Sequence, residues 1–390
     1  MLALILLCGL TGCGGKMPED IPFTPCAVIE EEGGRPLPPE TGDIVAAYFA
    51  WRGDSFGRAA GAVVPERAPQ ISEAVRQQEE HRTACLRAMM EDWDCLYSGA
   101  DTVYRVDNVM SFTGKYILNV YEFAYFNSWY TKYTSPEAAD RSGYGVKHVL
   151  TLRREETGWQ VAADDYDEGR PTNAATPHRF NNPAYRDYAG IPSSPRPPVT
   201  GSPPRLEENT PVPPDAYAPE AAVAYAEQWA AGRNREAFGD YSAVGGDCCN
   251  FASQCLLAGG LSMDDIWFSE EGEGSAAFIS STRLYAYLTG SRNCGRGIAI
   301  LRQSDGAGRR LSLGGNSQDA SAILRPGNPV FYRWSGGFIG DGKWSHTALC
   351  VGYLGDGTPA VSCHTGDKYR IKWNYGGAAC DYGTVLMETR

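Results

Sequence analysis

Apolar residues recur every three or four positions in the first part of the chain. Ile44, Ala47, Tyr48 and Trp51 share this spacing, and the same spacing returns from Ile71 onward. A period near 3.6 residues places such positions on one face of a helix. The first part of the chain is therefore predicted to form amphipathic helices that pack against a core.

Further along, the pattern becomes that of strands. Residues 103–110 and 116–126 are rich in β-branched and aromatic residues. Residues 148–154 and 159–163 flank a short polar segment that ends at Gly158, which is typical of a hairpin connection. These segments predict an antiparallel meander.

Helices followed by such a meander predict an α+β domain over residues 40–170. The closing hairpin with Gly158 and Trp159 resembles cone-shaped folds of the nuclear-transport-factor type, a resemblance that implies no particular site residue. Two roles stay open for this domain. It can hold a pocket within the cone, or it can serve as a spacer or interaction module.

Prolines are concentrated in residues 171–218. Of the 25 prolines in the chain, 13 lie between Pro171 and Pro219, where little apolar periodicity remains. Proline-rich chain is extended and semi-rigid. We therefore predict a linker that holds a second domain, residues 219–390, away from the first.

The N-terminal segment is apolar and ends in Leu10-Thr11-Gly12-Cys13. Residues 1–13 resemble a bacterial lipoprotein-type signal peptide, in which the final cysteine is lipidated after cleavage. The resemblance implies a lipid anchor at Cys13 and a tether over residues 14–39, which would hold the protein on the extracellular face of the cell membrane. A cleaved secretory signal, with release of the protein, is the alternative.

Length, charge and cysteine count narrow the class of protein. A chain of 390 residues fits two domains and a connection, and a formal net charge of −12 opposes nucleic-acid binding through a basic face. Besides Cys8 and Cys13, ten cysteines remain, with no CxxC pair. Neither a metal site nor a disulfide framework is therefore predicted. A Cys85–Cys95 bridge and two buried free thiols are the alternatives for that pair.

The segment Gly245–Gly260 is bracketed by glycines and carries Asp247, Cys248 and Cys249. Asp247 is predicted as the N-cap of a helix of about three turns, with Cys248 in the first turn. Unpaired N–H groups and the positive dipole end favour a thiolate there, so we expect a Cys248 pKa below its usual value. The same amides can hold an oxyanion, which makes Cys248 a candidate nucleophile.

Residues 217–390 resemble the bacterial putative amidase domain, a branch of the papain-like, NlpC-type cysteine hydrolases. The resemblance is carried by Gly-Gly-Asp-Cys-Cys-Asn-Phe-Ala-Ser-Gln-Cys-Leu, in which Cys249 stands where the family has Thr and Ala252 where it has Val. It implies a papain-like α+β fold, with Cys248 rather than Cys249 as the nucleophile. A structural pair of buried cysteines is the alternative.

The second domain contains two of the five histidines, His346 and His364. Residues 346–353 and 359–364 are predicted as strands joined by a turn around Asp356. This hairpin sets the two histidines opposite or diagonal to each other, where one imidazole can take the thiol proton and the other can orient it. By resemblance, His346 is the base and His364 is the third member.

Three further residues are candidates for the oxyanion or substrate site, namely Tyr241, Asp247 and Asp367. Tyr241 lies seven residues before Cys248, where related hydrolases often place a tyrosine on the oxyanion side, and it can equally be a core aromatic. Asp367 can bind substrate or cap a turn. Asn328 stands where the family has Asp, so a carboxylate role is lost at that position.

Together, these observations predict a cell-surface cysteine amidase or peptidase that works through a thioester on Cys248. No cofactor or metal is expected. A peptide or peptidoglycan-like substrate in the cell wall is inferred by analogy with the family alone. Two alternatives stay open: an acyltransferase that uses the same thiol, and a non-catalytic lipoprotein that binds peptide in the same groove.

Overall fold

The computed structural model describes a defined part of the chain: residue 23 and residues 26–66, 69–93, 95–130, 139–166, 217–242, 246–290, 295–303, 308–313, 315–334, 343–375 and 380–387. Cys13, with the rest of the predicted signal peptide, and the proline-rich segment up to residue 216 lie outside these ranges. Within the described residues, none of the helices combines the length and the hydropathy needed to cross a bilayer.

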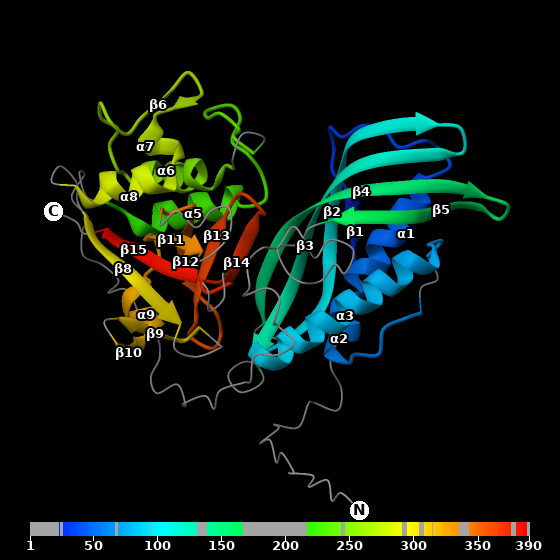
Figure 1. Cartoon of the computed structure of the whole chain (residues 1–390), viewed down its shortest axis with the longest axis horizontal. Coiled ribbons are helices and arrows are strands. Elements are labelled where there is room, and N and C mark those ends of the chain that lie inside the picture. Colours follow the sequence, from blue (N-terminus) through cyan, green and yellow to red (C-terminus); the bar gives the residue numbers. More distant parts are fainter. Residues whose placement is uncertain are drawn as a thin grey trace, which may run out of the picture.

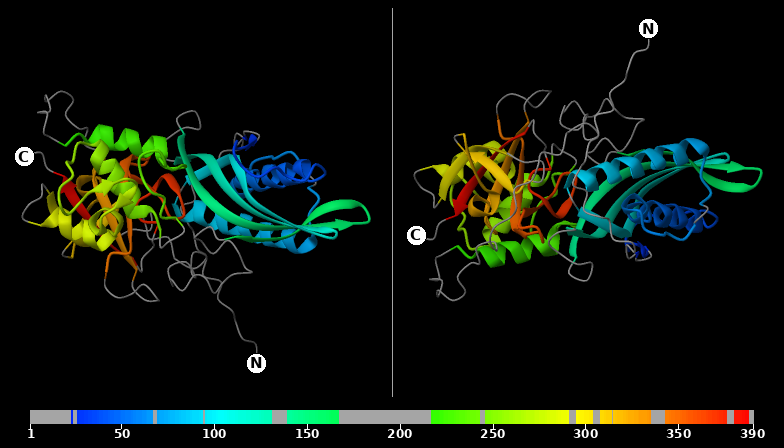
Figure 2. Two further views of the ribbon diagram at one scale, coloured as in Figure 1. Left: turned by 90° about the horizontal axis from the view of Figure 1, so that it is seen from above. Right: turned by 90° about the horizontal axis from the view of Figure 1, so that it is seen from below.

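The N-terminal domain packs three helices against one face of a curved antiparallel sheet (Figures 1 and 2). Its elements are α1 (Gly42–Gly53), α2 (Ser55–Ala60), α3 (Glu73–Trp93), β2 (Cys95–Phe112), β3 (Lys115–Tyr130), β4 (Asp140–Glu155) and β5 (Gly158–Tyr166). Val45, Tyr48 and Phe49 of α1 pack in one core cluster with Leu118 of β3 and Leu150 of β4. The helices and the meander predicted from the hydrophobic pattern are confirmed.

One strand of this domain lies within the segment predicted as a tether. β1 (Val28–Glu30) pairs with β2 in parallel, with Val28 opposite Thr102. The backbone N–H of Arg35 also donates to the carbonyl of Val106. Residues 28–35 are therefore part of the folded domain, because their backbone groups complete the edge of the sheet.

The interior of the N-terminal domain holds a buried network of charged side chains. Arg52 contacts Glu79 at 2.5 Å and Glu122 at 3.0 Å, and His148 contacts Glu122 at 3.0 Å and Asp164 at 2.9 Å. Burial would lower the pKa of His148, but the adjacent carboxylates outweigh burial and raise it to about 9. This network joins α1 and α3 to the sheet through balanced charges.

The C-terminal domain places four helices on one face of an antiparallel sheet (Figure 1). The helices are α5 (Pro219–Trp229), α6 (Cys248–Ala258), α7 (Ala276–Ile279) and α8 (Ser281–Thr289). The strands are β8 (Gly295–Gln303), β11 (Pro329–Trp334), β12 (His346–Tyr353), β13 (Pro359–Cys363), β14 (Lys368–Lys372) and β15 (Cys380–Met387). The α+β mixture expected from the sequence is therefore confirmed.

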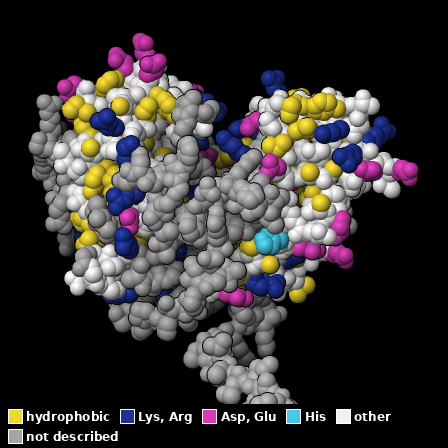
Figure 3. All heavy atoms as spheres, viewed as in Figure 1, with side chains coloured by type: hydrophobic (Ala, Val, Ile, Leu, Met, Phe, Trp, Pro, Cys, Tyr) yellow, Lys and Arg dark blue, Asp and Glu magenta, His cyan; other side chains and the backbone are white. Residues whose placement is uncertain are grey.

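Smaller elements flank this sheet. β9 (Arg310–Leu313), β10 (Asn316–Asp319) and α9 (Ala320–Ile323) follow β8 at the far edge. β6 (Ser269–Glu270) and β7 (Glu273–Gly274) form a separate hairpin beyond the helices, and acidic side chains gather there at the top of Figure 3.

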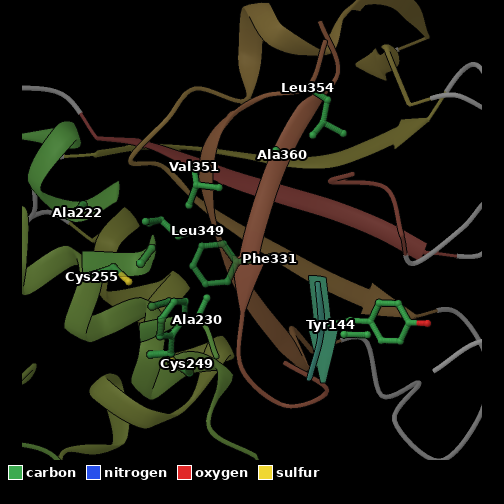
Figure 4. Close-up of a cluster of buried hydrophobic side chains, with 14 of the residues drawn as sticks. Tyr144, Ala222, Ala230, Cys249, Cys255, Phe331, Leu349, Val351, Leu354 and Ala360 are labelled. Carbon is green, nitrogen blue, oxygen red and sulfur yellow. The ribbon is translucent and has the colours of Figure 1, made fainter. Parts of the chain in front are cut away.

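The central sheet is buried on both faces because its strands alternate between two cores. Leu349 and Val351 of β12 face the helices, where Cys249 and Cys255 of α6 meet them (Figure 4). Ala348 and Cys350 of the same strand lie in the cluster on the opposite face. Neighbouring residues of β12 therefore point to different sides of the sheet.

The two domains share one 13-stranded sheet in the part of the chain that the structure describes. β5 pairs with the second half of β4, from His148 opposite Tyr166 to Glu155 opposite Gly158. β14 pairs with the first half of β4, with Lys368 opposite Tyr144. The second domain is thus docked on the first, in contrast to the expectation that the proline-rich linker would hold it away.

Candidate active site

Cys248 is the first residue of α6, a helix that is buried along most of its length. Cys248 is 7% exposed, whereas Cys249 is 1% exposed. Cys249 belongs to the core between α6 and the sheet. Of the two adjacent cysteines, Cys248 is therefore the one at the edge of the core.

The contacts of the Cys248 sulfur come from three elements. Ser281 Oγ, at the start of α8, lies 4.0 Å from it, and the backbone N–H groups of Thr347 and Cys249 are directed at it. Burial has the largest effect on the thiol and raises its pKa. The expected lowering is thus wrong for this arrangement, because loss of solvation outweighs the stabilisation by backbone N–H groups.

Asp247 stands at the N-cap position, but its carboxylate accepts no hydrogen bond from the backbone N–H groups of α6. One oxygen accepts from the N–H of Tyr241 (3.0 Å) and from the Asn250 amide (2.8 Å). The other lies 2.6 Å from His364 Nδ1 and 3.1 Å from Arg233 Nε. The N-terminal amides of α6 are consequently left uncapped by Asp247, so they can stabilise a sulfur or oxygen anion.

His364 uses both ring nitrogens. Nδ1 faces Asp247, Nε2 lies 2.8 Å from the carbonyl of Trp229, and the ring centroid is 4.1 Å from that of Phe251. Both polar partners are acceptors, so this hydrogen-bond arrangement assigns a proton to each nitrogen and a positive charge to the ring. In this arrangement His364 holds Asp247 in place rather than accepting a proton from the thiol.

His346 is buried next to Tyr332 and Tyr375, with ring centroids 5.4 and 6.2 Å away. Burial, together with the charge of Lys368, lowers its pKa to about 3. The imidazole is therefore neutral near pH 7 and chemically able to accept a proton.

The two histidines do not share a face of the hairpin. Leu349 of β12 stands opposite Ser362 of β13, and a bulge shifts the register beyond Cys350. Extending this register places Thr347, rather than His346, across from His364. The predicted convergence of the two rings is thus not found, and it is the backbone beside His346 that contacts the cysteine sulfur.

Residues 216–386 match the family model described as "Putative amidase domain". This match spans Cys248, His346 and His364, and it indicates amide hydrolysis as the activity of this domain.

An uncharacterized protein of Bacillus subtilis (strain 168), YhbB, is 27% identical over 160 residues, which make up 40% of this chain and 43% of the relative. The chain thus matches less than half the length of that relative. No solved structure matches it.

The two remaining predicted site residues of the C-terminal domain have their hydrogen-bond partners away from the sulfur. The Tyr241 hydroxyl accepts a hydrogen bond from the N–H of Gly274 (2.8 Å) and so holds the β6–β7 hairpin. Asp367 is buried and binds Arg233 through both carboxylate oxygens, at 2.9 and 3.1 Å. Asp367 therefore connects to Asp247 through a shared arginine.

Sequence reasoning missed several residues around the site. Ser281 and Thr347 contact the sulfur, and their hydroxyls are joined by a 2.8 Å hydrogen bond. Thr365 has a positive φ of 64° and accepts a 2.7 Å hydrogen bond from the N–H of Asp247. Of these residues, only Thr365 could have been found from the sequence, because it directly follows the candidate His364. Ser281 and Arg233 are single polar residues in otherwise ordinary segments.

Among the described residues, no group of three or more His, Cys, Asp or Glu side chains is arranged to hold a metal ion. The cysteines in the described ranges are free thiols. They include Cys85 and Cys95, for which a disulfide bridge was one of the two alternatives from the sequence.

Proposed function

We propose that the amidase domain is a cysteine amidase or peptidase with Cys248 as the nucleophile. The observation that carries this proposal is the position of its sulfur at the N-terminus of α6, against the N–H groups of Cys249 and Thr347. Such groups stabilise the charge that develops on sulfur and on the substrate carbonyl oxygen. The neighbouring Cys249 is part of the core.

In the proposed reaction, the neutral His346 imidazole accepts the thiol proton while the sulfur bonds to the carbonyl carbon. The carbonyl oxygen becomes an oxyanion held by backbone N–H groups. The C–N bond then breaks, the leaving amine takes the proton from His346, and a thioester remains on Cys248. Water attacks the thioester with His346 as base, the proton returns to the sulfur, and a carboxylic acid leaves.

This reaction requires the His346 ring to turn toward Cys248. The ring packs against Tyr332 and Tyr375, while the next residue, Thr347, already contacts the sulfur. Because the ring lies on the face of the sheet opposite α6, we propose that substrate binding accompanies a local backbone change at the start of β12 that brings the ring to the side of Cys248. Catalytic hydrogen bonds often form only in the substrate complex.

In this scheme His364 is the third member of the catalytic group, after Cys248 and His346. It acts on the side of the nucleophile. Its charged ring holds Asp247, the residue directly before Cys248. A fixed Asp247 fixes the start of α6 and therefore the direction of the cysteine side chain. This is a positioning role, since the ring nitrogens are occupied by Asp247 and the Trp229 carbonyl.

The proposal also includes three predictions from the sequence: a papain-like fold, a cone-shaped N-terminal domain and a lipid anchor. A cysteine helix packed on an antiparallel sheet supports a papain-like arrangement, and helices on a curved sheet support the cone-shaped N-terminal fold. A lipid anchor at Cys13 would place the enzyme on the extracellular face of the membrane, where a peptide or peptidoglycan-like substrate is accessible.

A non-catalytic peptide-binding domain is the second candidate. The raised pKa of Cys248, caused chiefly by burial, and the packing of His346 against two tyrosines favour it. A buried, unreactive thiol can line a peptide-binding site without attacking what binds there.

Acyl trapping tests the proposal. Purified protein is mixed with a panel of peptide amides, quenched in acid and analysed by mass spectrometry. We expect an acyl adduct on Cys248 that hydroxylamine removes, and none in Cys248→Ala. Binding of a peptide without an adduct or free acid would favour the binding domain, and transfer of the acyl group to an added amine in preference to water would indicate an acyltransferase.

A further inference from the structure

One side chain of the N-terminal domain reaches the candidate site. Tyr121, on β3, donates a 2.5 Å hydrogen bond to Asp367 Oδ2. Asp367 binds Arg233 through both oxygens, and Arg233 Nε lies 3.1 Å from Asp247 Oδ2. A chain of polar contacts therefore crosses the domain boundary and ends one residue before Cys248.

The docked strands leave room for this contact at a glycine. A Cβ atom added at Gly145 of β4 would collide with the hydroxyl of Tyr121. The N–H of the same glycine donates a 2.7 Å hydrogen bond to the carbonyl of Asp367. The first domain thus binds both the backbone and the carboxylate of one residue in the second domain.

Buried charges make this chain sensitive to each of its members. Burial would raise the pKa of Asp367, but His364 and Arg233 outweigh burial and lower it. Burial and the charge of Asp367 raise the pKa of Tyr121 well above its usual value, so the hydroxyl keeps its proton and donates. Asp247 and Asp367 therefore share the charge of Arg233, which also faces Asp240 at 3.8 Å.

We propose that Tyr121 is a positioning residue for the Cys248 site, so that docking of the N-terminal domain sets the reactivity of the cysteine. This inference rests on the proposed function. Without the Tyr121 hydroxyl, Asp367 interacts more strongly with Arg233. The positive charge of Arg233 then offsets less of the negative charge of Asp247. A negative charge beside the sulfur disfavours its thiolate. The first domain is then part of the active site rather than a spacer.

The interface offers a matched control. Ser142 of β4 also donates a hydroxyl hydrogen bond across the boundary, at 2.8 Å, to the carbonyl of Arg370. This bond ends on Arg370 rather than on Asp367 or Arg233. Ser142→Ala therefore removes an interface bond of the same kind as Tyr121→Phe and leaves the chain to Asp247 intact.

The experiment measures alkylation of Cys248 by iodoacetamide against pH in full-length protein, with mass spectrometry resolving Cys248 from Cys249. The titratable groups around the sulfur are Asp247, Cys249 and Cys363. We expect Tyr121→Phe to raise the pH midpoint of the alkylation curve by about half a pH unit. Below that midpoint, alkylation should be about threefold slower than in wild type. Ser142→Ala should leave the midpoint unchanged.

A double-mutant cycle separates positioning from general damage. Asp367→Asn should shift the midpoint by itself, and adding Tyr121→Phe should then change little, because the tyrosine acts through that carboxylate. Equal profiles for wild type, Tyr121→Phe and Ser142→Ala, with Cys248 reactive in all three, would overturn this inference alone. A wild-type Cys248 that never reacts would contradict the proposed function as well.

Discussion

His364 Nδ1 lies 2.6 Å from the carboxylate of Asp247, the residue directly before Cys248. The contact joins a turn at the end of β13 to the N-terminus of α6. It places the charged ring of the second histidine on the side of the nucleophile, whereas His346 lies with tyrosines on the other face of the sheet. The two histidines therefore have separable tasks, and each can be tested.

His364→Gln should weaken both the fold and the site. The substitution leaves the buried carboxylates of Asp247 and Asp367 to share Arg233, and breaking a buried ion pair costs about 3–5 kcal/mol. We expect a lower melting temperature and slower alkylation of Cys248. His81→Gln, at an exposed position of α3, is the control and should change neither. Equal melting temperatures for the two variants would show that His364 does not hold Asp247.

The reactivity of Cys248 toward iodoacetamide should rise with pH and show no acidic plateau. Burial raises the thiol pKa above its ordinary value of 9.0, and the thiolate is the reacting form. The rate constant should therefore still be increasing at pH 9. A plateau that persists below pH 6 would mean that a thiolate–imidazolium pair already exists in the resting protein.

The N-terminal domain should lose stability in alkaline solution. The pKa of His148 is raised from 6.5 to about 9, chiefly by Asp164 and Glu122 acting against burial. A raised folded-state pKa gives stability that is complete below pH 6.5 and is lost as pH rises through 9. Urea titrations monitored in this domain should show that loss. His148→Gln should be less stable at pH 6 and nearly independent of pH between 6.5 and 9, and an unchanged slope would assign the loss to another group.

Cys13 should be lipidated in cells. The pattern Leu10-Thr11-Gly12-Cys13 motivates this prediction, and Cys13 lies outside the described residues. Globomycin should cause a heavier precursor to accumulate, and labelled palmitate should attach to wild type but not to Cys13→Ala. Cys85→Ala is a control for general acylation. Palmitate-free protein found entirely in the medium would leave only a cleaved secretory signal.

The sequence predicts elements better than it predicts their contacts. Glycines and Asp247 locate the start of α6, because caps and turns are local. The true partners of Asp247 are Arg233 and His364, which come from elements distant in the chain. No local pattern encodes that meeting, so the carboxylate was expected to cap the helix.

Strand partners and registers show the same limit. The bulge beyond Cys350 changes which residue stands across from His364, and a shift of one residue moves a side chain to the other face. β14 docks on the first half of β4, whereas β5 pairs with its second half. Neither feature has a local signature, so the sequence predicted converging histidines and separated domains.

Selective labelling tests the central claim most directly. Wild type, Cys248→Ala and Cys249→Ala are treated with a peptide amide probe that carries a cysteine-directed electrophile, and the adduct is located by mass spectrometry. Because Cys249 is enclosed in the core and Cys248 lies at its edge, we expect Cys248→Ala to abolish labelling and Cys249→Ala to retain most of it. Retained labelling in Cys248→Ala together with its loss in Cys249→Ala would contradict the assignment of the nucleophile.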